Sequence, residues 1–178
     1  FFFGLLPFYL MAATVVVPVK YGKEVLSLTL PATATIGDLR LQIAERTYIP
    51  PLAQKLCGVK GPDTMALSDA GAGRVMVIGT PAQDLSLLSK TINMSAEERI
   101  QRVVWGVKYG VNRPLKDHPR PDPDALRVMQ ELCTQALVQL DAVEAPAGST
   151  VRDQRRAAVA EVEQIAATLD ALSVTAEV

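Results

Sequence analysis

The chain contains few of the side chains on which most metal sites and disulfide-rich folds depend. Its 178 residues include one histidine, His118, and two cysteines, Cys57 and Cys133. A zinc site of the Cys/His type needs four such ligands close together, so none is expected. The histidine lies in a proline-rich loop and is expected to be solvated. Each cysteine lies in an apolar pattern, which predicts two buried free thiols and a reducing compartment.

The chain also lacks an excess of either charge and lacks the common catalytic motifs. Its 18 basic and 19 acidic residues give a formal net charge of −1. Proteins that bind nucleic acids or acidic membranes usually carry a basic surface, so neither partner is expected. The sequence has no GxxxxGK[ST] loop and no Ser/His/Asp or Cys/His set. We therefore expect a protein that is not an enzyme and that needs no metal or other cofactor.

The N-terminal part of the chain is apolar, and the first charged residue is Lys20. A run of this length is similar to a signal peptide or a membrane segment. However, no basic residues precede it, Pro7 and Pro18 interrupt it, and its second half has the composition of a strand. We expect residues 1–11 to be a disordered leader or extension. The alternative is that residues 1–19 anchor a membrane-tethered or secreted structural protein.

Residues 12–80 alternate between strand-like and helix-like patterns. Four segments have the composition of strands: 14–19, 24–30, 54–59 and 74–78. The first two are separated by a hairpin signal at residues 21–23. Between the second and third, a helix is predicted to begin at a capping box of Thr35 and Asp38 and to end before Pro50. The predicted order is two strands, a helix and two further strands.

Several short motifs in this region are similar to motifs of ubiquitin. They are Gly22-Lys23, Thr35-Ile36, Ile49-Pro50-Pro51, Gln54-Lys55-Leu56 and Leu67-Ser68-Asp69. Residues 12–80 therefore resemble a β-grasp ubiquitin-like domain. The chain continues past Thr80 without a terminal diglycine, so the resemblance implies an integral domain and not a conjugated modifier.

The resemblance to ubiquitin also implies a docking patch on an apolar sheet face. The matching positions are Cys57, Met76 and Ile78. Strand alternation gives one face to Met76 and Ile78 and the other to Val75 and Val77. The alternative is that all four β-strand residues belong to the core, with Met76 and Ile78 covered by the tail. Separately, a slip of one residue in the alignment would exchange the two faces.

Helical patterns dominate residues 94–178, after a predicted linker at residues 81–93. The first helix begins with a capping box at Ser95. Residues 112–121 hold three prolines and are predicted to be a loop. The second and third helices are predicted to begin at the N-caps Asp122 and Thr150. Three amphipathic helices of this kind bury their apolar stripes in an antiparallel bundle, so the expected fold class of the whole chain is α+β.

Four polar residues lie outside the apolar seams of the last two helices: Glu131, Asp141, Arg156 and Gln164. The two acidic residues are about 15 Å apart along one helix, and the other two are about 12 Å apart along the next. If the helices are antiparallel across the turn at Pro146, the stripes can form one composite face for another protein. Spacing alone leaves open the alternative that these side chains are simply solvated.

These four residues are similar in type and spacing to the chaperone contacts of the BAG domain, a three-helix module of chaperone regulators. That family carries Glu, Asp, Arg and Gln on its second and third helices as contacts to the ATPase domain of the seventy-kilodalton heat-shock chaperones. The resemblance is best over residues 122–173, and a preceding ubiquitin-like domain is known in the family. Glu161 and Glu163 depart from it, because related domains tend to be more basic there, and this departure predicts weaker binding.

The resemblance implies a cytoplasmic, monomeric co-chaperone. Such a protein would bind the chaperone ATPase domain, promote ADP release and connect the chaperone to the proteasome or to ubiquitin receptors. A further hypothesis keeps the ubiquitin-like domain and the bundle but gives the bundle a partner that is not a chaperone.

Overall fold

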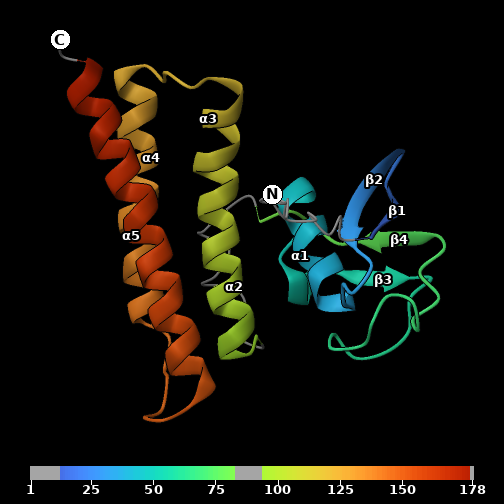
Figure 1. Cartoon of the computed structure of the whole chain (residues 1–178). Coiled ribbons are helices and arrows are strands. Elements are labelled where there is room, and N and C mark those ends of the chain that lie inside the picture. The colour runs from blue at the N-terminus through green and yellow to red at the C-terminus, as the bar shows by residue number, and fades with distance from the viewer. Residues whose placement is uncertain (1–12, 83–93, 177–178) are drawn as a thin grey trace, which may run out of the picture. The chain divides into compact units, whose positions relative to one another are not determined.

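The computed structural model describes residues 13–82 and 94–176 (Figure 1). The chain divides into two compact units, Phe1–Ile43 with Lys55–Ile78 and Ala44–Gln54 with Gly79–Val178. A sheet and helices are both present, which confirms the mixed α+β class. The predicted leader at residues 1–11 and nearly all of the predicted linker at residues 81–93 lie outside the described residues.

The first unit is built on a four-stranded mixed sheet with the order β2-β1-β4-β3. The strands are β1 Thr14–Tyr21, β2 Glu24–Pro31, β3 Lys55–Cys57 and β4 Val75–Ile78. β1 pairs antiparallel with β2 and parallel with β4, and β3 pairs antiparallel with β4. The hairpin turn needs Gly22, whose φ of 58° is easily adopted only without a side chain.

Strand β1 includes the second half of residues 1–19, the segment considered above as a possible membrane anchor. Its residues pair with β2 along their whole length, from Thr14 to Tyr21. Its inward side chains Val17 and Val19 are buried in the core of the first unit. The second half of the apolar run at residues 1–19 is therefore part of the sheet. No helix in the described parts of the chain is long and apolar enough to span a membrane.

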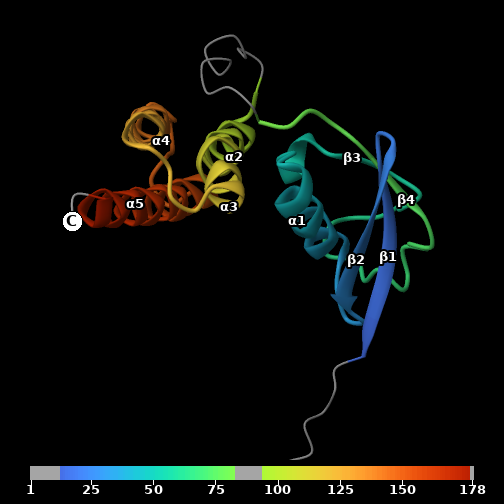
Figure 2. The same cartoon turned by 90° about the horizontal axis from the view of Figure 1, so that it is seen from above.

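Helix α1 (Ile36–Thr47) lies beside the sheet (Figure 2) and begins at the predicted capping box. The Thr35 N–H donates to Asp38 Oδ2 at 2.8 Å, and the Asp38 N–H donates to Thr35 Oγ1 at 3.2 Å. The bonds from Thr35 hold the pKa of Asp38 below its ordinary value of 3.8. The charged cap therefore stabilises the fold above that pH, and its contribution is lost as the pH falls through the lowered pKa. The helix ends three residues before Pro50, as predicted.

The second unit contains three long helical segments that share one apolar core. Its helices are α2 Ala96–Val107, α3 Arg113–Asp117, α4 Pro123–Asp141 and α5 Thr150–Ala176. A π-helical segment, Lys108–Asn112, joins α2 to α3. The buried side chains of this core include Val107, Leu126, Leu140, Val162 and Leu169. α4 runs opposite to α5 and beside it (Figure 1).

Two helices of this unit begin where the sequence predicted, and two features of the other helix starts differ from the prediction. The capping box at Ser95 and the N-cap at Asp122 are both formed. The proline-rich segment at residues 112–121 is not entirely a loop, because α3 lies within it. Its proline at position 114 stands at the start of α3, directly after the π-helical segment. The cap of α5 is Ser149 and not Thr150, since Ser149 Oγ accepts the Arg152 N–H at 3.3 Å.

Candidate protein-binding surfaces

The four polar residues singled out by their spacing are all exposed on α4 and α5: Glu131, Asp141, Arg156 and Gln164. The two helices pack directly against each other. Their apolar seams supply most of the shared core, so their polar stripes face outward. The structure therefore brings the two stripes onto neighbouring helices.

Asp141 and Arg156 are available to a partner. Within the described residues, neither side chain takes part in an ion pair. Asp141 is the last residue of α4. A carboxylate there faces the negative end of the helix dipole, which costs roughly 0.3–1 kcal/mol. Helix stability therefore does not explain the position of Asp141. Glu131 is held more firmly, because its Oε1 accepts a hydrogen bond from Gln135 Nε2 at 3.0 Å.

Gln164 lies on another side of α5 from Arg156. Eight residues of an α-helix turn a side chain by about 80° from the first direction. Gln164 borders a groove of about 280 Å³ that α5 forms with the π-helical segment and α3. The flat composite face expected from spacing is therefore only part of the arrangement. Sequence periodicity could not reveal the groove, because its other wall comes from a distant helix.

Glu161 is engaged by a basic residue of the same unit. Lys108 Nζ lies 2.7 Å from Glu161 Oε1 and 4.3 Å from the ring centroid of Trp105. The Lys108 side chain is only 16% exposed, so its charge is poorly screened by solvent. This cation offsets part of the negative charge of Glu161. Of the two acidic residues expected to weaken binding, Glu163 alone has no ion pair among the described residues.

The exposed face of the sheet is a second candidate surface. In β4, Val75 and Val77 are buried, whereas Met76 is 40% and Ile78 is 50% exposed. The alternative that all four belong to the core is therefore wrong. Cys57 is paired with Met76 across the β3–β4 ladder, so the three predicted patch residues lie on one face.

The two thiols differ in their surroundings. Cys133 is buried as predicted, and burial raises the pKa of its thiol. Cys57 is only partly buried, because it lies on the outer face of the sheet. Both are free.

Two lysines belong to the same sheet face and were not identified from the sequence. Lys20 of β1 is paired with Met76, and Lys55 of β3 is paired with Ile78. Both lysines are exposed. Each exposed apolar residue of β4 thus has a cation directly beside it. The motif comparison missed them because only the strand register shows which residues are neighbours.

The comparisons with known proteins find a family match within the helical part of the chain. Residues 107–172 match the BAG domain. The matched segment contains all four exposed polar residues of α4 and α5. Among solved structures, the crystal structure of ATBAG1 in complex with HSP70 aligns with a TM-score of 0.40 and 24% identity. That alignment covers 90% of this chain and 98% of that chain. A comparison with curated proteins gave no match.

The BAG domain match begins at the last residue of α2, so most of α2 precedes it. This agrees with the weak sequence resemblance over the first helix. The π-helical segment, α3, α4 and most of α5 lie inside the match. The pair of Lys108 and Glu161 is therefore internal to the BAG domain segment.

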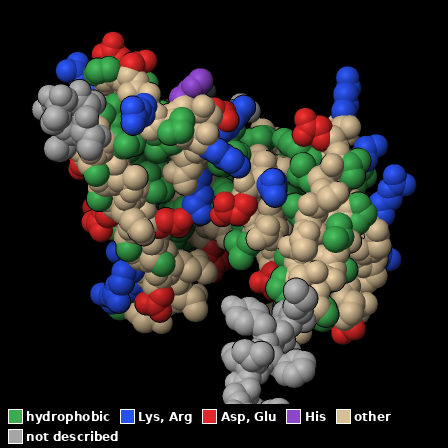
Figure 3. All heavy atoms as spheres, turned by 45° about the horizontal axis from the view of Figure 1, so that its top comes forward, with side chains coloured by type: hydrophobic (Ala, Val, Ile, Leu, Met, Phe, Trp, Pro, Cys, Tyr) green, Lys and Arg blue, Asp and Glu red, His purple; other side chains and the backbone are tan. Residues whose placement is uncertain are grey.

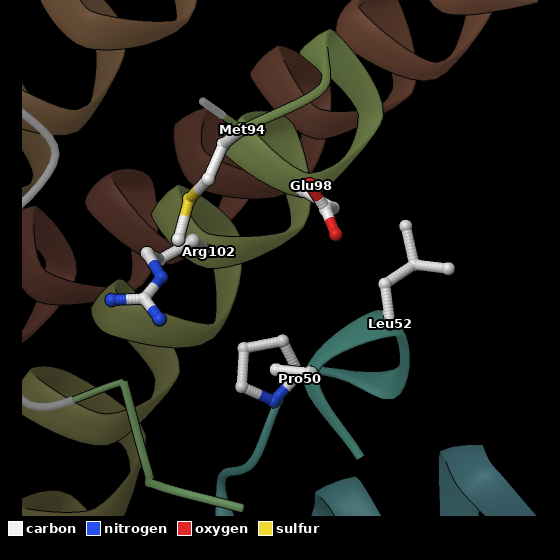
Figure 4. A pocket seen from close by; sticks show the side chains of 6 residues that line it. Pro50, Leu52, Met94, Glu98 and Arg102 are labelled. Atoms are coloured by element: carbon white, nitrogen blue, oxygen red, sulfur yellow. The ribbon is translucent and has the colours of Figure 1, made fainter. Parts of the chain in front are cut away.

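One pocket of the second unit is too small for a ligand, and the described residues form no cluster suited to a metal ion. This pocket (Figure 4) has a volume of about 30 Å³ and is lined by Pro50, Leu52, Ala53, Met94, Glu98 and Arg102. This is room for about one water molecule and far below the size of a small-molecule site. No group of three His, Cys, Asp or Glu side chains in the described ranges could hold a metal ion. On the face shown in Figure 3, acidic and basic side chains are interspersed.

Proposed function

We propose that this protein is a co-chaperone that binds the ATPase domain of a seventy-kilodalton heat-shock chaperone and promotes ADP release. The observation that carries the proposal is the BAG domain match over residues 107–172. Within it, the four residues of the family's chaperone-binding pattern occupy exposed positions on two adjacent helices. The protein acts by binding, without covalent chemistry of its own.

The charges on α4 and α5 suit such an interface. Arg156 offers a planar guanidinium that can donate two parallel hydrogen bonds to a carboxylate of the chaperone. Asp141 and Glu131 offer carboxylates to chaperone cations, and Gln164 can both donate and accept. Charge pairs of this kind set specificity and the rate of association more than raw affinity.

Nucleotide exchange follows from linkage between two binding sites. A protein that binds the open, nucleotide-free ATPase domain better than the closed, ADP-bound domain must weaken ADP binding by the same factor. Coupling of this kind typically amounts to 1–3 kcal/mol, or about 5- to 150-fold. No residue of the co-chaperone needs to touch the nucleotide.

The test is ADP release from the isolated ATPase domain, measured with a fluorescent ADP in the presence and absence of the full chain. We expect saturating protein to accelerate release by about tenfold or more. By reciprocity, saturating ADP should weaken binding of the protein to the ATPase domain by the same factor by which the protein raises the equilibrium Kd of ADP. An unchanged release rate together with ADP-independent binding would rule out exchange and leave recruitment as the role of the BAG domain.

We further propose that the first unit is a β-grasp ubiquitin-like domain that connects the chaperone to the proteasome or to ubiquitin receptors. The strand order, the position of α1 and the exposed Met76 and Ile78 support this proposal. The neighbouring Lys20 and Lys55 favour receptors that combine apolar and acidic side chains. A ubiquitin-like scaffold with another partner for its helices is the alternative.

Replacement of Met76 by aspartate should abolish receptor binding and leave chaperone binding unchanged. The new carboxylate would place an unpaired charge in the centre of an apolar contact. Binding can be measured with purified proteasome and with ubiquitin-binding domains. Thr29→Asp is the matched control, because it adds the same charge to an exposed position on the edge strand β2. Equal binding by the Met76 variant and the wild type would remove this face from the proposal.

A further inference from the structure

A groove lies between α5 and the end of the first helical segment of the second unit. Its volume of about 280 Å³ suits one or two protein side chains better than a drug-sized ligand. Its lining residues are Asn112, Leu115, Glu161, Gln164, Ile165 and Thr168. One of these is Gln164, so the groove is continuous with the surface assigned above to the chaperone.

The lining of the groove has the chemistry of a cation site with apolar walls. Hydrogen-bond acceptors come from the carboxylate of Glu161, the carboxamides of Asn112 and Gln164, and the hydroxyl of Thr168. None of the six described lining residues is basic. Leu115 and Ile165 supply apolar surface, which suits the aliphatic stem of a long basic side chain.

Glu161 retains capacity for a second cation. Its bond to Lys108 uses Oε1, and an ionised carboxylate can accept about four hydrogen bonds. The Glu161 side chain is 42% exposed, whereas that of Lys108 is largely covered. The carboxylate is therefore held in place from the inside and remains open towards the groove.

We propose that this groove receives a lysine or arginine side chain of the chaperone ATPase domain, with Glu161 as its anionic partner. The inference rests on the proposed function. The sequence comparison predicted that Glu161 weakens chaperone binding, whereas this proposal predicts that Glu161 strengthens it. It also extends the interface from α4 and α5 to Asn112 of the π-helical segment.

A purely structural role of Glu161, through its bond to Lys108, predicts a different result from a binding role. If Glu161 only holds Lys108, both Glu161→Gln and Lys108→Met should weaken chaperone binding, because each breaks the 2.7 Å pair and Lys108→Met also removes the 3.7 Å pair with Glu45. If Glu161 binds the partner's cation, Glu161→Gln should raise Kd by about tenfold. Lys108→Met should then leave Kd unchanged or lower it, since it frees the carboxylate.

The measurement is Kd of full-length variants for the isolated chaperone ATPase domain by titration calorimetry, with thermal unfolding as the check on folding. The difference between wild type and Glu161→Gln should shrink as the salt concentration rises. Glu163→Gln is the matched control, because it removes the same charge two residues away, about 160° around the helix. Thr168→Trp, which fills the groove from an exposed position, should also weaken binding by tenfold or more.

The possible results distinguish failure of the groove assignment from failure of the co-chaperone proposal. If wild type binds and Glu161→Gln and Thr168→Trp bind equally well, the groove assignment is wrong and the co-chaperone proposal stands. Weakening by both Glu161→Gln and Lys108→Met also overturns the assignment. If the wild-type chain does not bind the ATPase domain, both proposals fall together.

Discussion

Replacing Asp141 and Arg156 together by alanine is expected to weaken binding to the chaperone ATPase domain by about a hundredfold or more. Hydrogen bonds to charged groups contribute roughly 1.5–3 kcal/mol each, and 1.4 kcal/mol corresponds to a factor of ten. Both side chains are exposed and without an ion pair among the described residues, so the fold should survive. Loss of a carboxylate from the end of α4 should even be slightly stabilising. Calorimetric Kd values and thermal unfolding of the full-length variant provide the measurement.

The matched control for this double variant is Asp117→Ala with Arg120→Ala. These residues are also exposed, lie within the BAG domain match and change the net charge by the same amount. We expect the control to bind like the wild type. Equal weakening by both double variants would show that diffuse electrostatics, and not the polar stripe, governs binding. Unchanged binding of the Asp141 and Arg156 variant would refute the assignment of this surface.

Replacing Leu140 by alanine should lower the free energy of unfolding of the second unit by about 3 kcal/mol. Leu140 is fully buried in the core shared by the helices of this unit, and truncation would leave a cavity there. Urea unfolding followed by tryptophan fluorescence is a suitable measurement, because the single tryptophan, Trp105, is buried in α2. It therefore reports on the second unit.

Val138→Ala is the control for this prediction. Val138 lies two residues before Leu140 on the same helix but is 66% exposed. Its truncation removes little buried surface, and alanine has the higher helix propensity, so stability should change by less than about 0.5 kcal/mol. If the two variants lost equal stability, α4 would not face the core as described.

Local signals allowed much of the fold to be predicted from the sequence. The caps at Thr35, Ser95 and Asp122 form as predicted, because each depends only on residues three positions apart. The three prolines at residues 112–121 misled the prediction. The one at position 114 stands at the start of α3, directly after the π-helical segment, and sequence alone did not place it there.

The candidate surfaces could be predicted only in part. The family pattern identifies Glu131, Asp141, Arg156 and Gln164, and whether they contact a chaperone stays a prediction. Neighbours that come from distant segments leave no local signal. The pairing of Lys108 with Glu161 depends on how two helices pack, and Lys20 adjoins Met76 only because of strand register.

The π-helical segment determines the direction in which the side chains after it point around the helix axis. Its backbone bond from the Arg113 N–H to the Lys108 carbonyl encloses one more residue than an α-helical turn. Each residue of an α-helix turns by about 100°, so one inserted residue redirects every later side chain by that angle. Asn112 and Leu115 reach the groove beside α5 in this phase. Deletion of a single residue here would rotate them away while leaving the composition of the helix almost unchanged.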